Sequence, residues 1–164
     1  MEKVVREQIL HILENNSKLT ESDIAIMLGI PEQETREEIA ALEKAHIICG
    51  YHTLIDWNRV NDDDVTALVE LRVTPQGGEG YQKLAQKINN YPQVVTLYLM
   101  SGAYDFLVMV KGKNLKEISL FVSEKLASIE EVQNTTTHFT LTKYKELGVS
   151  FEVKQIDERM VVTP

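Results

Sequence analysis

Residues 94–110 read VVTLYLMSGAYDFLVMV, and this stretch decides the fold. β-branched, aromatic and other apolar residues fill both arms, and a glycine-containing turn over 101–104 separates them, as in two strands joined by a short connection. We therefore predict strands over 94–100 and 105–110. A strand in a sheet with one solvated face alternates apolar and polar residues. These two strands hardly alternate, so both faces of their sheet are expected to be buried.

The segments on either side of this pair complete a pattern of six elements. The pair is preceded by a predicted strand over 65–73 and a predicted helix over 81–88. It is followed by a helix whose inward residues run from Ile118 to Ile129, and by a strand over 132–142. This order predicts the ferredoxin-like arrangement, in which two helices cover one face of a four-stranded antiparallel sheet. Because only one face is covered, the other is predicted to pack against a second copy, which makes a homodimer.

The N-terminal third has the spacing of three short helices. The first ends near residues 15–17, the second begins at Thr20 and ends at Gly29, and the third begins at Pro31. Asp23 lies three residues after Thr20 in an acidic variant of the capping box, and glycine supplies the positive φ of a helix C-cap. Two helices joined by a glycine-containing turn predict a helix-turn-helix.

A β-prone segment over 47–55 and a polar segment over 56–64 follow these helices. The first is predicted as a wing or connecting strand and the second as a linker. The sequence therefore predicts an α+β protein with four parts. They are a winged helix-turn-helix domain over 1–50, a connecting strand and linker over 51–64, a ferredoxin-like effector-binding and oligomerisation domain over 65–146, and a C-terminal extension over 147–164. The extension is too irregular to assign, and its apolar residues favour packing on a partner subunit over disorder.

The composition of the 164 residues excludes several classes of protein. The longest uninterrupted apolar run, residues 106–110, is far shorter than the roughly 20 residues of a membrane span. The first residues lack the pattern of a secretory signal. A single cysteine, Cys49, cannot form an internal disulfide, and with four scattered histidines no metal and no cofactor are expected. A cytoplasmic protein that does not bind membranes is therefore expected.

The net charge of −8 is concentrated in the N-terminal third. Residues 1–60 contain six Lys or Arg against eleven Asp or Glu, a net charge of −5. The third helix and its end, over 31–46, contain two basic and five acidic residues. Carboxylates that face phosphates weaken binding to DNA. The charge therefore opposes the usual function of a helix-turn-helix.

Three motifs nevertheless follow one another in a familiar order. They are LEKAHIICGY over 42–51, GAYD over 102–105 and VQNTTT over 132–137. With these motifs and this order of elements, the chain resembles the Lrp/AsnC family of leucine-responsive, or feast/famine, transcription regulators over about residues 3–146. It departs from the family in its acidic third helix, in His46 where a glycine is usual, and in the extension after Phe151.

The resemblance implies a DNA-binding regulator that senses a small effector, usually an amino acid, at the interface between sensing domains. The oligomer would be a dimer or an octamer of four dimers. The motifs carry six effector candidates: Ser101, Gly102, Tyr104, Asp105, Thr135 and Thr137. Asp105 would accept the ammonium group, and backbone N–H groups near Gly102 or threonine hydroxyls would bind the carboxylate. The alternative is a glycine turn with a capping aspartate and no ligand.

The resemblance also implies double-stranded DNA as a partner, with the third helix in the major groove. Gln33 and Arg36 are the candidate base readers, since Gln reads adenine and Arg reads guanine. Lys18 and Lys44 lie beside this helix in the sequence and are candidate phosphate contacts. The two glutamates that follow Arg36 are expected to oppose the phosphates.

Two other functions remain open. The acidic third helix fits an amino-acid-sensing oligomer with weak or no DNA binding that acts through a protein partner or pairs with a basic paralogue. Some proteins of this two-part fold resemble siroheme or haem decarboxylases, which would use His and Arg around a tetrapyrrole. This chain offers His52 and His138, but Arg72 is the only Arg between residues 60 and 158. Several carboxylates call for more bidentate partners, so no catalytic residues are assigned and no enzyme is expected.

Overall fold

The computed structural model describes residues 3–60, 64–74, 77 and 79–151, and the chain divides into two compact units, Met1–Ile55 and Asp56–Pro164. The sequence predicts a connecting strand and linker over 51–64, and the division between the two units lies between Ile55 and Asp56. Among the described residues, no helix is long and apolar enough to cross a membrane. Each unit is described by itself.

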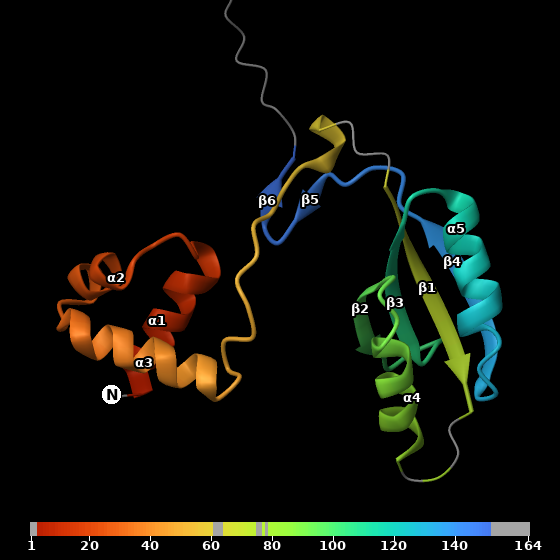
Figure 1. The fold of residues 1–164 in the computed structure, drawn as a ribbon, viewed down its shortest axis with the longest axis horizontal. Coiled ribbons are helices and arrows are strands. Elements are labelled where there is room, and N and C mark those ends of the chain that lie inside the picture. Colours follow the sequence, from red (N-terminus) through yellow and green to blue (C-terminus); the bar gives the residue numbers. More distant parts are fainter. Residues whose placement is uncertain (1–2, 61–63, 75–76, 78, 152–164) are drawn as a thin grey trace, which may run out of the picture. The chain divides into compact units, whose positions relative to one another are not determined.

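The first unit consists of three helices, α1 (Lys3–Asn15), α2 (Glu21–Leu28) and α3 (Glu32–Lys44) (Figure 1). All three predicted helices are confirmed. Apolar residues of the three helices form one core around Ile9, Leu13, Ile24 and Ile39. The helices are short, so the burial of this common core, rather than helix propensity, stabilises them.

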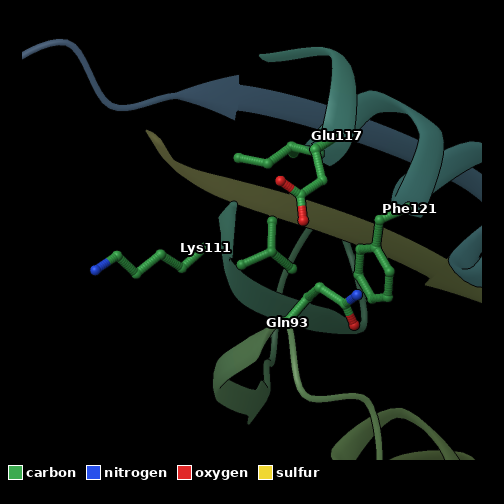
Figure 2. A pocket seen from close by; sticks show the side chains of 6 residues that line it. Gln93, Lys111, Glu117 and Phe121 are labelled. Atoms are coloured by element: carbon green, nitrogen blue, oxygen red, sulfur yellow. The ribbon is translucent and has the colours of Figure 1, made fainter. Parts of the chain in front are cut away.

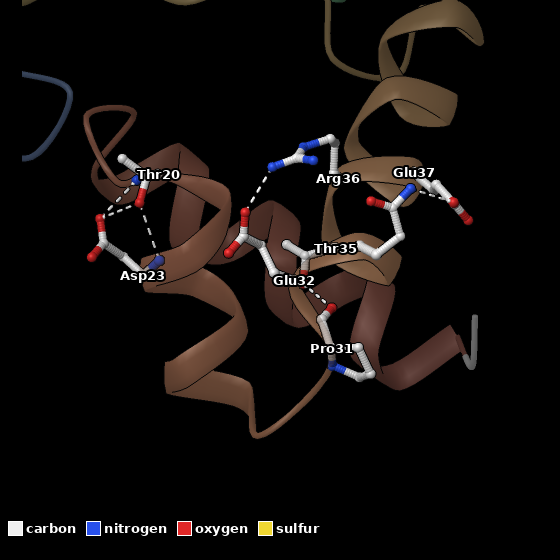
Figure 3. A network of polar contacts seen from close by, with 8 residues as sticks. Thr20, Asp23, Pro31, Glu32, Thr35, Arg36 and Glu37 are labelled. Atoms are coloured by element: carbon white, nitrogen blue, oxygen red, sulfur yellow. Dashed lines mark hydrogen bonds and ion pairs between the residues drawn. The ribbon is translucent and has the colours of Figure 1, made fainter.

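The connection between α2 and α3 follows the predicted chemistry. The Thr20 hydroxyl accepts the N–H of Asp23 at 3.1 Å, and the Asp23 carboxylate accepts the N–H of Thr20 at 2.9 Å (Figure 3). Hydrogen bonds from Thr20 lower the pKa of the Asp23 carboxyl. At the other end, Gly29 adopts a φ of 66°, the left-handed conformation that glycine tolerates best. On α2 itself, Ala25 is buried and Met27 is 61% exposed.

The prediction of a wing or connecting strand over 47–55 is wrong. These residues follow α3 and form no strand. Their N-terminal end is held by the helix instead, since the N–H groups of Ile47 and Ile48 donate to the Leu42 carbonyl at 3.0 and 3.3 Å. A strand needs a neighbouring strand to satisfy its backbone groups, and β-prone composition does not supply one.

The second unit contains the predicted four-stranded antiparallel sheet (Figure 1). Its strands are β1 (Val65–Val73), β2 (Val94–Leu99), β3 (Phe106–Gly112) and β4 (Val132–Phe139), in the order β2-β3-β1-β4. Helices α4 (Gly80–Asn89) and α5 (Leu115–Phe121) connect them, and α5 continues into a π-helical turn, Val122–Leu126. The predicted ferredoxin-like order of elements is confirmed.

The two helices bury one face of this sheet, which we call the covered face. Residues paired across an antiparallel ladder point to the same side. Ala67, Val69 and Leu71 of β1 pair with Val110, Val108 and Phe106 of β3, and all six are at most 1% exposed. Leu84 and Ile88 of α4 and Ile118, Phe121 and Leu126 of the second helical segment complete this core.

The alternate residues form the opposite face, which we call the open face. Its central residues include Leu68, Glu70, Tyr98, Leu107, Met109, Thr136 and His138. Leu68, Leu107 and Met109 are half-buried, and Tyr98 is 57% exposed. The sequence argument for apolar residues on both faces therefore agrees with their placement, and no helix of the described residues covers the open face.

The last strand is shorter than predicted, because β4 ends at Phe139 rather than at residue 142. A short hairpin follows, formed by β5 (Lys145–Glu146) and β6 (Val149–Ser150). Its turn consists of Leu147 and Gly148, which both have a positive φ. A 3-10 turn, η1 (Trp57–Arg59), precedes the sheet. Most of the predicted extension, residues 152–164, and residues 61–63 of the predicted linker lie outside the described residues.

Candidate functional site

The outer surface of α3 follows from its helical period. Thr35, Glu38, Ile39 and Leu42 are buried and define the inner face. With 3.6 residues per turn, the residues farthest from this face are Gln33, Glu37, Ala40 and Lys44. All four are exposed. Of the predicted DNA contacts, Gln33 and Lys44 therefore lie on the outermost line of α3.

Arg36, the other predicted base reader, lies on the flank of α3. Its guanidinium donates to the Glu32 carboxylate at 2.7 Å, one helical turn away (Figure 3). Arg36 also lines an open groove of about 310 Å³ within the first unit, whose walls include Leu19, Ile39 and Tyr51. Lys18 is exposed just before α2. The structure thus places Gln33 and Lys44 together on one line and sets Arg36 and Lys18 apart from it.

The expectation that both glutamates after Arg36 oppose DNA is wrong for Glu38. Its side chain is buried on the inner face of α3 and is paired with Arg6 of α1. Burying a carboxylate is costly unless a partner compensates it, and Arg6 provides that charge. Only Glu37 points outward, and its carboxylate accepts the Gln33 amide at 2.7 Å.

A further acidic residue of α3 is also bonded within the unit. The Glu43 carboxylate accepts the Tyr51 hydroxyl at 2.9 Å. Partial burial, followed by this hydrogen bond and by the negative charge of Glu43, raises the pKa of Tyr51. The excess of acids in the sequence of α3 therefore overstates the negative charge that its outermost line presents.

The second candidate site is the turn between β2 and β3. Ser101, Gly102 and Ala103 are exposed, and Tyr104 and Asp105 are half-buried. A side chain added at Gly102 would meet nothing within 4 Å, so the backbone here is accessible to a ligand. The turn is thus an exposed backbone surface that ends at a fixed carboxylate.

The Asp105 carboxylate already has two partners in the chain. One oxygen accepts the N–H of Val73 at the end of β1 at 2.8 Å, and the other accepts the Tyr81 hydroxyl from α4 at 3.1 Å. The backbone N–H of Asp105 donates to the Leu71 carbonyl at 2.9 Å. Asp105 therefore ties the start of β3 to β1 and α4. Both oxygens of this carboxylate are thus engaged within the chain, one by a backbone N–H and one by a side-chain hydroxyl.

Thr135 and Thr137 do not contact this turn within one chain. They pair with Leu71 and Val69 of β1, so their half-buried side chains lie on the covered side of β4. Leu71 also pairs with Phe106, so β1 separates the threonines from the turn. Two strand spacings amount to roughly 10 Å. The six predicted effector residues thus form one contiguous group, over 101–105, and one separate pair.

Two residues at the turn were missed from the sequence. The sequence pattern marks Tyr81 only as the start of the predicted helix over 81–88, and Arg72 only as the one arginine between residues 60 and 158. The Arg72 guanidinium donates to the Ala103 carbonyl at 2.7 Å. The hydrogen bond of Tyr81 to Asp105 raises the pKa of the tyrosine. Both residues are far from the turn in sequence, and no local pattern links them to it.

A narrow crevice beside α5 is lined by Gln93, Lys111, Glu117 and Phe121 (Figure 2). The Glu117 carboxylate accepts the N–H of Lys113 at 2.8 Å. The Lys111 amine points away from the crevice and lies 2.9 Å from an Asp64 oxygen. The crevice is too narrow to hold a water molecule, so it is a packing defect rather than a binding site.

Comparisons with known proteins bear on both units. The model of the Lrp/AsnC ligand binding domain matches residues 66–149. YugG, an uncharacterized HTH-type transcriptional regulator of Bacillus subtilis, is 42% identical over 158 residues, which cover 96% of this chain and 95% of YugG.

Solved structures share the fold. An AsnC family regulator of Agrobacterium tumefaciens is 25% identical, with a TM-score of 0.68 over 93% of this chain and 96% of that one. A transcriptional regulator of Neisseria meningitidis, solved as its L-Met complex, is 21% identical, with a TM-score of 0.69 over 94% and 97%. The matched domain, the full-length relative and the order of elements together show that the chain belongs to the Lrp/AsnC family of transcription regulators.

Proposed function

We propose that the chain binds double-stranded DNA through α3 and that an α-amino acid bound at the turn over 101–105 controls it. The observation that carries the first part is that four of the five acidic side chains of α3, Glu32, Glu37, Glu38 and Glu43, are bonded within the unit. Glu38 is paired with Arg6, and Glu32 with Arg36. The outermost line of α3 then holds one carboxylate and one amine, and a neutral line does not repel phosphates.

Gln33 and Lys44 are the contacts that this line favours. The Gln33 amide is held by Glu37 in an exposed pair, and such a pair is worth only about 0.2–0.5 kcal/mol. Adenine in the major groove can therefore replace Glu37 as its partner. Arg36 must leave Glu32 to reach a base, which costs about 0–1 kcal/mol for an exposed ion pair.

Fluorescence anisotropy with fragments of the source genome tests this placement. Gln33→Ala is expected to cost about 1–3 kcal/mol at the preferred site and to relax its specificity, whereas Lys44→Ala weakens all fragments alike. Glu37→Gln should tighten binding and steepen its salt dependence. Glu7→Gln on α1 is the matched control for net charge, and an equal effect of both changes would remove Glu37 from the interface.

The effector part of the proposal rests on the Asp105 carboxylate and the accessible backbone of the turn. The regulator of Neisseria meningitidis was solved with L-Met, so L-Met is the first ligand to test by calorimetry, followed by each of the other common amino acids. Asp105→Asn retains an acceptor for the Val73 N–H and removes the charge. It is expected to weaken binding by about 1–3 kcal/mol, and unchanged affinity would exclude Asp105.

Assembly and location complete the proposal. The open face supports a homodimer, since it carries apolar side chains in the middle of a sheet, and octamers of four dimers would follow the family pattern. Light scattering separates a monomer, a dimer and an octamer. A regulator of this kind acts in the cytoplasm, where the DNA is, and none of its residues is assigned a catalytic role.

A second candidate function is an amino-acid-sensing oligomer that acts through a protein partner. It is favoured by the engagement of both base readers, Gln33 and Arg36, with glutamates of their own helix. Binding of an amino acid, together with no binding of any genomic fragment even at low salt, would support this function over the first.

A further inference from the structure

The two oxygens of the Asp105 carboxylate are held in different ways. Oδ2 accepts the backbone N–H of Val73 at 2.8 Å, and Val73 belongs to a buried strand. Oδ1 accepts the hydroxyl of Tyr81 at 3.1 Å, and Tyr81 is a surface residue, 37% exposed, in the first turn of α4. One oxygen is therefore fixed by the sheet, and the other is covered by a side chain that can rotate away.

The ring of Tyr81 lies against the sheet without being enclosed by it. Its centroid is 6.0 Å from that of Phe106, in a tilted contact, and more than a third of the residue's surface is exposed to solvent. Arg72 holds the neighbouring Ala103 carbonyl from β1. The turn and the fixed oxygen thus keep their positions when Tyr81 moves, which is what a preorganised site requires.

We infer that the Tyr81 hydroxyl is an internal occupant of the position that the effector's ammonium group takes on Asp105. This inference rests on the proposed amino-acid site. An ammonium group makes a charge-assisted hydrogen bond to a carboxylate, which is stronger than the bond from a neutral phenol. The amino acid therefore displaces Tyr81, and the first turn of α4 loses its tie to the start of β3. Binding at the turn is thereby transmitted to α4.

The variant Tyr81→Phe tests this inference, because it keeps the ring and removes the competing hydroxyl. A competing hydrogen bond is worth about 0.5–1.5 kcal/mol, so the full-length variant should bind L-Met, or whichever common amino acid binds the wild type, about 2- to 12-fold more tightly. Tyr91→Phe is the matched control, since Tyr91 packs edge-on against Phe121 elsewhere in the same unit. The affinity of this variant for the amino acid should equal that of the wild type.

A second measurement follows Tyr81 in the wild-type protein. Its ring signal in the NMR spectrum, assigned by its loss in Tyr81→Phe, should shift when the amino acid saturates the site. Affinity that is unchanged or weaker in Tyr81→Phe, or a ring signal that stays in place, overturns the inference and leaves the proposed site intact. If neither protein binds any amino acid, the proposed effector function fails instead. If Tyr81→Phe binds an amino acid and the wild type binds none, the inference is supported, because the Tyr81 hydroxyl would then block the site completely.

Discussion

The two faces of the four-stranded sheet carry similar amino acids and differ in what lies over them. On the covered face, Val69, Leu71 and Val108 are completely buried under α4 and α5. On the open face, Leu107 and Met109 are half-buried and no helix of the described residues packs on them. The apolar residues over 106–110 of β3 therefore alternate between the face that α4 and α5 cover and a face that no helix of the described residues covers.

The energetic meaning of the faces differs accordingly. Apolar area removed from water is worth about 25 cal/mol per Å². On the covered face, this burial stabilises the folded unit. In the proposed dimer, burial of the open face would stabilise association, because large apolar side chains at the centre of an interface dominate the affinity. Substitutions on adjacent residues of one strand should therefore separate folding from association.

The largest expected difference is between Val108→Asp and Leu107→Asp. A carboxylate at Val108, 0% exposed, would have no partner, and an uncompensated buried charge costs about 3–5 kcal/mol. We expect Val108→Asp to unfold the second unit. Leu107→Asp should leave the fold intact and dissociate the copies. Circular dichroism and light scattering check the two outcomes, and unfolding by both variants would mean that the open face belongs to the core.

Truncating one aromatic residue on each face gives a smaller but still clear contrast. Phe106 is 1% exposed on the covered face, so Phe106→Ala should lower the free energy of unfolding by about 3–5 kcal/mol. Tyr98→Ala should lower it by less than about 1 kcal/mol in dilute, dissociated protein and should raise the dimer dissociation constant. Urea denaturation at two protein concentrations measures both effects. Equal losses in dilute protein would contradict the distinction.

Close packing beneath the covered face is tested by a glycine. A Cβ added at Gly112 would lie 3.0 Å from Cγ1 of Ile118, so Gly112→Ala is expected to destabilise the unit by about 1–3 kcal/mol through overpacking. Gly102→Ala is the control, because its Cβ would meet nothing within 4 Å. Thermal unfolding compares the two. If the melting temperature of Gly112→Ala is no lower than that of Gly102→Ala, then Ile118 of α5 can shift to accommodate the added methyl group, and the packing there is not tight.

The smallest effect is expected on the polar side of the open face. His138 lies 3.2 Å from Glu70, and both side chains are partly in solvent. An exposed pair of this kind is worth about 0–1 kcal/mol, so Glu70→Gln should change the free energy of unfolding by less than about 0.5 kcal/mol in dilute protein. If Glu70→Gln instead weakened association tenfold, the interface between two copies would include β4 as well as the apolar strands β2 and β3.

Strong periodicity made the sheet and its helices predictable. The strand over 65–73 agrees with β1 at both ends, and the residues expected inward on α5, such as Phe121, are buried. Glu38 could have been placed from the same period, because it follows Thr35 by three residues and precedes Leu42 by four, on the face that both define. The helical period therefore places Glu38 on the buried face and Glu37 on the exposed one.

The failures have a different origin, since they depend on contacts that no local pattern encodes. The segment over 47–55 has strand-like residues, but no strand in the described part of the chain pairs with its backbone. The bonds of Asp105 to Val73 and Tyr81 span 32 and 24 positions. Such pairs follow from the register of the assembled sheet. The sequence could identify the turn as exceptional and could not identify what holds it.

The strand order also has a consequence for how the chain is made. β1 pairs with β4, the last strand of the sheet, and Glu70 of β1 lies 68 positions before its neighbour His138. The three helices of the first unit need only local contacts and emerge first during synthesis, so they fold early. The sheet stays incomplete until β4 is translated, with one edge of β1 unpaired and the apolar strands β2 and β3 already present. On the ribosome, the nascent chain is therefore most prone to aggregate after its first unit has folded and before its fourth strand arrives.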